Sequence, residues 1–149
     1  MAWIYESSTG SLLYSENNSP FGTLVGKGYS GKKGFKNNIL FDTVKDVGPI
    51  PPGKYIIGLS YQSISKGPMT MNLNPFGHNA FGRTLFRIHG NNRKNDASQG
   101  CIILSPDLRK KIGESSDRVL IVVRKLKLPD SLPQISLRQS FTGGGGLRG

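Results

Sequence analysis

The chain has 149 residues, the size of one domain that can bury a sizeable hydrophobic core. Its 20 glycines and 9 prolines favour short strands joined by turns and argue against a helix bundle. A formal net charge of +11 predicts attraction to polyanions, and the single cysteine excludes an internal disulfide.

The first part of the chain is predicted to form strands. Apolar residues on both sides of Ser8-Thr9-Gly10-Ser11 predict a hairpin over residues 2–14. Further strands are expected at 21–29 and, after the proline-rich segment 47–53, at 54–61. The N-terminus has no basic stretch before an apolar run, so we expect no secretory signal, and no segment approaches the ~20 apolar residues that cross a bilayer. We therefore expect a soluble chain, made in the cytoplasm, without membrane insertion.

The middle of the chain is predicted to alternate loops and strands. Residues 65–83 are rich in Asn, Gly and Pro and predict a long loop, a kind of segment that is often functional. Strands are expected at 84–89 and at 101–104. The polar segment 90–100 predicts a loop that folds back and brings the ends of these two strands together.

A short helix is predicted directly after the second of these strands. Ser105 suits the N-cap and Pro106 the first helical position. Leu108 and Ile112 lie four residues apart on one helix face, and Gly113 is expected to end the helix.

The composition changes towards the C-terminus. The apolar run within residues 118–126 predicts a strand that is buried on both faces. Residues 129–149 contain two prolines and four consecutive glycines, which predict an irregular or disordered tail. The sequence thus predicts one domain over residues 1–128 and a tail over 129–149.

Cys101 and His89 are the candidate catalytic pair. Each stands at the end of a predicted strand, and a thiol with an imidazole is the minimum equipment for cysteine nucleophilic catalysis. Taken alone, Cys101 is also typical of a small core side chain, and His89 of a hydrogen-bonded structural histidine. Their adjacent glycines, Gly90 and Gly100, and the polar loop between them favour a catalytic pair facing one shared, solvent-open pocket.

The residues around this pair suit acyl chemistry. An imidazolium neighbour lowers a thiol pKa from its usual value of about 8.5, and the main-chain N–H groups of Gly100 and Cys101 are candidate oxyanion donors. A metal site would need carboxylates such as Asp96 beside the histidines His78 and His89, at no recognisable spacing. We therefore expect no metal and no cofactor.

The order of these residues resembles a known family. His89-Gly90, a polar loop and Ser98-x-Gly100-Cys101 resemble the signature of YkuD-type L,D-transpeptidases. Four segments are similar, in their order, to the L,D-transpeptidase-like effectors of type VI secretion: Gly28–Gly31, Lys36–Asn38, Val47–Tyr55 and Phe86–Gly90. The resemblance covers roughly residues 1–125 and implies a mainly β, single-domain, YkuD-like sandwich or distorted barrel with one or two short helices.

The resemblance also implies roles for single residues. Cys101 would be the nucleophile, His89 its general base, Gly100 an oxyanion donor with Cys101, and Ser98 the residue that shapes the turn. His89 would be oriented by a backbone carbonyl near Gly90 or by Asp96. Substrate carboxylates and amides would be held by polar side chains around the pair: Arg83, Arg87, Asn91, Asn92 and Gln99. Gln99 stands where the general transpeptidase signature has histidine, and His89 and Cys101 are closer in sequence than the catalytic pair of that signature. In both respects the chain resembles the effector branch.

The implied reaction is acyl transfer on peptidoglycan tetrapeptide stems. Cys101 would attack the carbonyl of the diamino acid at the third position and release the terminal D-alanine. The thioester would then pass to water, to a D-amino acid or to a neighbouring stem. The implied partners are peptidoglycan stem peptides, a cognate immunity protein and a component of a type VI apparatus that delivers the chain into the periplasm of target cells.

Two functions of other classes stay open. One is a non-catalytic peptidoglycan-binding module of the same fold. The other is a basic nucleic-acid-binding domain, which would need aromatic side chains interleaved with Lys and Arg on one face. The sequence has no clear stripe of this kind, so nucleic acid is not expected as a partner.

Overall fold

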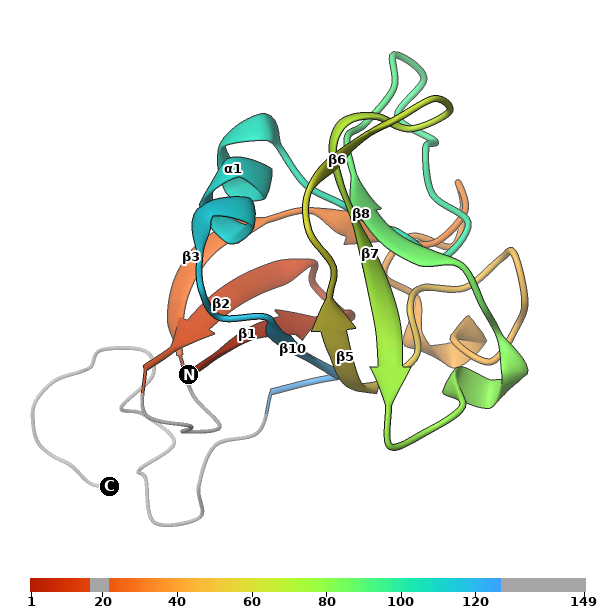
Figure 1. Ribbon diagram of the computed structural model, residues 1–149. Coiled ribbons are helices and arrows are strands. Elements are labelled where there is room, and N and C mark those ends of the chain that lie inside the picture. The colour runs from red at the N-terminus through yellow and green to blue at the C-terminus, as the bar shows by residue number, and fades with distance from the viewer. Residues whose placement is uncertain (17–21, 127–149) are drawn as a thin grey trace, which may run out of the picture.

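The computed structural model describes residues 1–16 and 22–126, which form a mainly β structure with one α-helix (Figure 1). The strands in chain order are β1 (Ala2–Glu6), β2 (Ser11–Ser15), β3 (Thr23–Lys27), β4 (Tyr29–Ser30), β5 (Gly53–Ile57), β6 (Tyr61–Ser63), β7 (Gly67–Phe76), β8 (Phe86–His89), β9 (Ile102–Ile103) and β10 (Val119–Val123). Helix α1 spans Pro106–Glu114, and 3-10 turns lie at Ile39–Phe41 and Ala80–Gly82. The predicted tail, 129–149, lies outside the described residues.

The strands form one sheet that does not close on itself. Its path runs β3-β2-β1-β10-β5-β7-β8-β9-β4, and β6 pairs with β7 beside this path. The mainly β prediction is therefore confirmed, and the described sheet is open between β3 and β4. Figure 1 shows how strongly the sheet curves, with α1 beside it.

The predicted N-terminal hairpin is confirmed, and its first strand lies inside the sheet, between β2 and β10. Strands β1 and β2 pair antiparallel, with Ile4 opposite Leu13. Strand β1 also pairs parallel with β10, with Trp3 opposite Leu120. Strand β10 is less buried than its apolar sequence predicted, because Leu120 and Val122 are buried whereas the three residues between and beside them are only partly covered.

The prediction of a long loop at 65–83 is wrong. Residues 67–76 form β7, the longest strand, which pairs with β5 on one side and β8 on the other. Met71 and Leu73 face the core while Asn72 and Asn74 are exposed, which is the alternation of a strand with one wet face. The Asn, Gly and Pro residues that suggested a loop lie on the exposed face and at the ends of this strand.

Helix α1 begins as predicted and ends later. The Ser105 side chain accepts a hydrogen bond from the Leu108 N–H, as an N-cap does. Gly113 does not stop the helix, because one more residue follows within it before the Ser115 N–H bonds to the Ile112 carbonyl. The helix lies against β7, and its residues Leu108 and Ile112 are buried.

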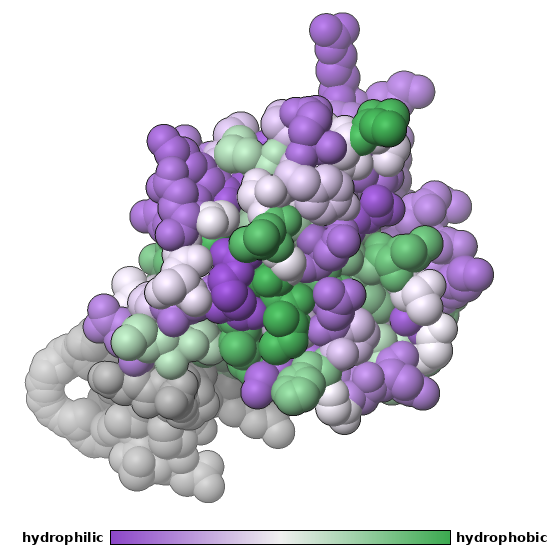
Figure 2. Space-filling model, in the orientation of Figure 1, coloured by the Kyte–Doolittle hydropathy of each residue, from purple (hydrophilic) through white to green (hydrophobic). Residues whose placement is uncertain are grey.

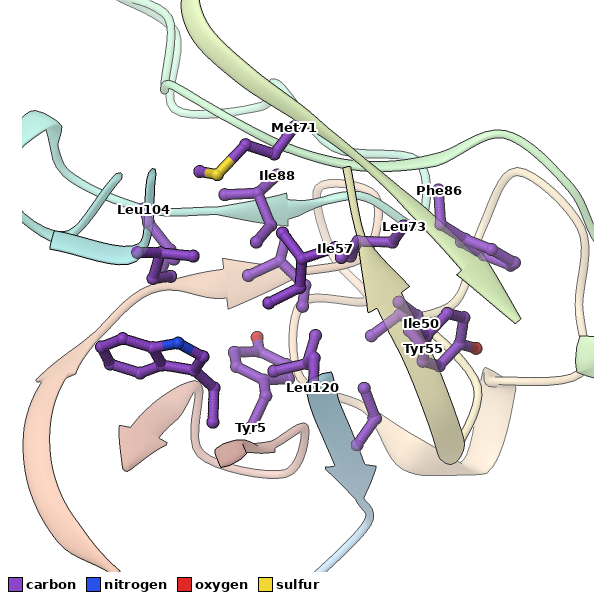
Figure 3. Packing of buried hydrophobic residues seen from close by; sticks show 14 of the residues in the cluster. Tyr5, Ile50, Tyr55, Ile57, Met71, Leu73, Phe86, Ile88, Leu104 and Leu120 are labelled. Carbon is purple, nitrogen blue, oxygen red and sulfur yellow. The ribbon is translucent and has the colours of Figure 1, made fainter. Parts of the chain in front are cut away.

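A single apolar cluster fills the space inside the curved sheet (Figure 3). Large fully buried side chains at its centre include Tyr5, Tyr55, Met71 and Leu120. Each side chain of this size contributes about 1.5–3 kcal/mol through burial. The cluster includes Ile88 of β8 and Ile102 of β9, but neither His89 nor Cys101.

The surface is mostly hydrophilic on the face that Figure 2 shows, with hydrophobic side chains in small separate groups. The most exposed large apolar residues are Leu40, Leu59, Ile64 and Leu85. In the part of the chain that the structure describes, no helix has the length and apolar character needed to span a membrane.

Candidate active site

The sheet brings the two predicted catalytic residues onto one face of neighbouring strands. Strands β8 and β9 pair in parallel, with Ile88 opposite Ile102 and His89 opposite Ile103. Side chains alternate between faces, so Cys101, one residue before Ile102, lies on the same face as His89 and opposite the core side chains. The prediction that the loop 90–100 brings these strands together is therefore confirmed.

A buried serine shapes the turn before the thiol. The Ser98 hydroxyl donates to the Cys101 carbonyl at 2.6 Å and accepts hydrogen bonds from the N–H groups of Gly31 at 3.0 Å and Gly100 at 3.1 Å. The Ser30 hydroxyl, fully buried, donates to the Gly100 carbonyl at 3.1 Å and accepts from the Ile50 N–H. Two buried hydroxyl groups thus fix the backbone that presents Cys101.

Gly100 is required by its conformation and by its neighbour. Its φ is +134°, and a Cβ atom there would lie 2.5 Å from Arg83 Nη2. The prediction that its N–H is an oxyanion donor is not supported by this structure, because that N–H donates to Ser98 Oγ. The Cys101 N–H stays the predicted donor.

His89 is oriented by a backbone carbonyl. The residue is 2% exposed, and its Nδ1 lies 2.9 Å from the Gly90 carbonyl oxygen, which only accepts hydrogen bonds. Nδ1 therefore carries the proton, and Nε2, buried and without a hydrogen-bond partner among the described residues, carries the lone pair. The alternative orienting group, Asp96, bonds to Asn92 instead.

The environment of His89 keeps the imidazole neutral. Burial lowers its pKa from 6.5 to about 4; the hydrogen bond to Gly90 opposes this, and the nearby charges of Lys66, Arg87 and Arg109 add to it. At neutral pH the ring is therefore a base with a free lone pair, not the imidazolium that the sequence suggested as a partner for the thiol.

The Cys101 thiol is protonated and mostly buried. It is 8% exposed and donates to the Leu85 carbonyl at 3.7 Å. Burial raises its pKa, and hydrogen bonding and charge from Arg87, with the charge of Lys66, partly oppose that rise. Leu85 itself has a φ of +65°, a strained conformation for a leucine, of a kind found beside functional sites.

The thiol and the imidazole line two adjoining cavities. A cavity of about 450 Å³ contains Cys101, and a smaller one of about 150 Å³ contains His89. The two share the lining residues Lys66, Asn92 and Ala97. One pocket shared by the thiol and the imidazole stays a prediction: the two cavities adjoin at these three residues, and the thiol is turned towards Leu85.

The predicted substrate-binding residues differ in whether their hydrogen-bonding groups are already occupied. Arg83 is buried, and its Nη1 and Nη2 groups donate to four backbone carbonyls, those of Asp42, Gly48, Pro49 and Gln99. Arg83 therefore ties the loop at 42–49 to the turn before Cys101, and a substrate contact through these groups would have to displace a carbonyl.

The other predicted substrate residues lie at or near the cavity of Cys101. Arg87 and Gln99 line it, as does Asn92. Asn91 lines the smaller cavity and accepts a hydrogen bond from the Tyr29 hydroxyl at 2.7 Å. Their contacts with substrate stay predictions.

Sequence reasoning missed Ser30 and Lys66 as residues of this site. Ser30 lies in a segment that carried the family resemblance, yet its bond to Gly100, 70 residues away, leaves no local signal. Lys66 lies in the segment predicted as a loop. In the structure it lies in the turn between β6 and β7, so the pairing of these two strands determines its position. The described residues hold no group of three or more His, Cys, Asp or Glu side chains that could bind a metal.

The family comparison decides what the chain is related to. The model of the Tlde1 domain matches residues 25–121, which is more than half of the chain and includes both His89 and Cys101. The chain belongs to the Tlde1 domain family. This is the type VI L,D-transpeptidase effector family, so the resemblance seen in the sequence is confirmed.

Comparison with solved structures finds an L,D-transpeptidase (Yku) from Stackebrandtia nassauensis. It is 17% identical to this chain, with a TM-score of 0.47, and the match covers 82% of this chain and 54% of that one. The chain thus spans about half the length of that protein. The comparison with curated protein sequences found no match.

Proposed function

We propose that this Tlde1 domain catalyses cysteine-dependent acyl transfer on peptidoglycan tetrapeptide stems. The observation that carries the proposal is the state of His89 within a family match that includes Cys101. Its Nδ1 is held by the Gly90 carbonyl, and its Nε2, which has no hydrogen-bond partner among the described residues, lies on the sheet face that also bears the thiol. A neutral, oriented imidazole beside a thiol is the arrangement of a general base and its nucleophile.

The first half of the reaction is acylation of Cys101. The thiol turns from the Leu85 carbonyl towards His89, and its proton passes to Nε2 as sulfur bonds to the carbonyl carbon of the third residue of the stem. The Cys101 N–H stabilises the resulting oxyanion. The carbon–nitrogen bond then breaks, His89 gives its proton to the nitrogen, and D-alanine leaves.

The second half transfers the acyl group from sulfur. Water gives a tripeptide (L,D-carboxypeptidase activity), a D-amino acid gives an exchanged stem, and the amine of a neighbouring stem gives a crosslink (L,D-transpeptidase activity). Asn92 and Gln99, which line the cavity, and Asn91 beside it have amide groups suited to the peptide bonds of a stem.

As a family member the chain fits an antibacterial effector that consumes the donor stems of a rival cell. Delivery by a type VI apparatus into the periplasm of the target cell, with an immunity protein that protects the producer, belongs to this proposal. The net charge of +11 suits an anionic wall.

Mass spectrometry of purified tetrapeptide muropeptides tests the reaction. With wild type, loss of the terminal D-alanine would indicate trimming, its replacement by another residue would indicate exchange, and dimers would indicate crosslinking. Cys101→Ala and His89→Gln should each lose at least about 10³-fold in rate. His78→Gln, which changes the chain's other histidine, is the matched control and should keep its activity. Unchanged muropeptides with wild type, or full activity in Cys101→Ala, would rule the proposal out.

A non-catalytic peptidoglycan-binding module is the second candidate. It is favoured by the contact of the thiol with the Leu85 carbonyl and by the raised pKa of the thiol. In that case wild type leaves every muropeptide unchanged and binds isolated cell walls as tightly as Cys101→Ala does.

A further inference from the structure

The cavity around Cys101 is lined by charged side chains that have no role yet in the proposed reaction. Six charged side chains line it: Lys45, Asp46, Lys66, Arg83, Arg87 and Asp96. The Nη groups of Arg83 are occupied by backbone carbonyls, and Asp96 bonds to Asn92. In the described parts of the chain the ion pair found joins Arg124 to Asp42, so neither Lys66 nor Arg87 has its charge taken up by a carboxylate there.

Arg87 lies directly beside the nucleophile. Arg87 precedes Ile88, and Cys101 precedes the Ile102 that pairs with Ile88, so extending the register by one residue puts the two across from each other on one sheet face. Both side chains line the same cavity. The Nε atom of Arg87 is buried and has no hydrogen-bond partner among the described residues. Its side chain lines both the cavity of Cys101 and a second cavity of about 540 Å³. A buried guanidinium N–H without an acceptor is costly, which points to an acceptor supplied by a ligand.

Lys66 approaches the same place from another element. It lies in the turn between β6 and β7, and it lines both the cavity of Cys101 and that of His89. Figure 1 shows this turn beside the loop that joins β8 to β9. The charges of Lys66 and Arg87 both lower the pKa of His89 and that of Cys101, as cations close to both groups do.

We propose that Arg87 and Lys66 form a carboxylate subsite that holds the C-terminal carboxylate of the D-amino acid released from the stem. This rests on the proposed acyl transfer. In the terminal D-alanine the carboxylate carbon is two bonds from the scissile nitrogen, so a carbonyl carbon placed at the sulfur brings that carboxylate within reach of a cation beside the thiol. Guanidinium groups bind carboxylates through paired hydrogen bonds, and Lys66 adds a second positive charge.

The subsite would couple binding to catalysis. A carboxylate bound between Lys66 and Arg87 brings one negative charge, which offsets one of the three positive charges that weaken His89 as a base. His89 therefore becomes more basic when a stem with a free terminal carboxylate is bound. A stem whose terminus is blocked gives neither the contact nor this gain.

Two donor stems that differ in one group test the subsite: the tetrapeptide with a free terminal carboxylate and the same peptide with a terminal carboxamide. Wild type should prefer the acid by at least about tenfold in kcat/KM. Arg87→Gln and Lys66→Gln should reduce that preference, the double variant should abolish it, and Arg87→Lys should restore part of it. Lys45→Gln removes the same charge from the same cavity and should keep the preference.

The ratio of the two rates separates the subsite from other roles of Arg87. A loss of thiol activation slows both donors equally and leaves the ratio unchanged. Equal turnover of acid and amide by wild type, or an undiminished preference in the double variant, would overturn the subsite while the proposed reaction stands. If wild type turns over neither donor, the reaction fails, and calorimetric binding of the two peptides to Cys101→Ala decides the subsite: tighter binding of the acid supports it, equal binding overturns it.

Discussion

Ser98 holds the turn before Cys101 through three hydrogen bonds at one hydroxyl group. Two of these bonds satisfy N–H groups, and the third satisfies the carbonyl of the nucleophile's own residue. The hydroxyl is buried, so water cannot replace it when it is removed. The serine of the sequence motif therefore has a structural reason that does not involve contact with substrate.

Ser98→Ala should lower the free energy of unfolding by about 2–4 kcal/mol, because it leaves several buried polar groups unpaired. Urea unfolding followed by circular dichroism measures this. Ser60→Ala, at an exposed position, is the control and should change stability by less than about 0.5 kcal/mol. Equal stability of the two variants would contradict the assigned role.

His89 should make stability fall in mild acid. Its pKa is 6.5 in the unfolded chain and about 4 in the folded one, so between these values the unfolded chain binds a proton that the folded chain does not. The contribution of His89 to the free energy of unfolding is thus at its full value above pH 6.5 and is lost as the pH falls towards 4. When the pH is lowered from 7 to 4, the free energy of unfolding of His89→Gln should fall by up to about 3 kcal/mol less than that of wild type. Parallel pH profiles of the two proteins would count against a buried neutral imidazole.

The thiol of Cys101 should titrate above the usual value for cysteine, because burial raises its pKa. Iodoacetamide alkylation across the pH range should therefore show an inflection above about pH 8.5. The low exposure of the thiol slows alkylation by the same factor at every pH, so it does not move the inflection. Arg87→Gln should move it further up, whereas Lys45→Gln should leave it in place. An inflection near pH 6 in wild type would show a thiolate–imidazolium pair instead.

Strand β7 shows where the sequence was hardest to interpret. The alternation of Met71, Asn72, Leu73 and Asn74 indicates a strand, but the surrounding Pro and Gly residues indicate a loop. Both signals were local, and the pairing of β7 with β5 and β8 decided between them. The hairpin β1–β2 and the start of α1 were predictable because a turn or a cap residue fixes each of them locally.

The site was predictable in its residues more than in its geometry. The spacing of His89 and Cys101 at strand ends placed them on neighbouring strands, as observed. The direction of the thiol, towards the Leu85 carbonyl, and the position of Lys66, in the turn of the β6–β7 hairpin, complete the site's geometry. Neither is encoded near the motif.

The turn that precedes β9 should tolerate no side chain at position 100. Gly100→Ala meets both a positive φ and the Arg83 guanidinium, which four carbonyls hold in place. Gly34→Ala meets a positive φ of 90° with no atom within 4 Å, so it measures the conformational cost alone. Thermal unfolding should show that Gly100→Ala is the more destabilising by at least about 1 kcal/mol. Equal losses would mean that Arg83 moves aside freely.

At the scale of the whole molecule, charge should govern attraction to the cell wall. With a net charge of +11, binding of Cys101→Ala to isolated cell walls should weaken as salt rises from about 50 to 500 mM, because exposed charges are screened. Co-sedimentation measures this. The acid-over-amide preference of wild type should change less, since the subsite is partly buried and screened less. Salt-independent sedimentation would exclude charge as the main attraction.

The pairing of β1 with β10 has a consequence for how the chain is made. Residue 3 sits beside residue 120 inside the sheet, so one edge of β1 lacks its partner until almost the last described residue has been synthesised, although its other edge pairs with β2 at once. Pairings so distant along the chain slow folding. During translation, therefore, the sheet stays interrupted between β1 and β5 until β10 emerges from the ribosome, and the strands that carry the nucleophile have no finished scaffold before then.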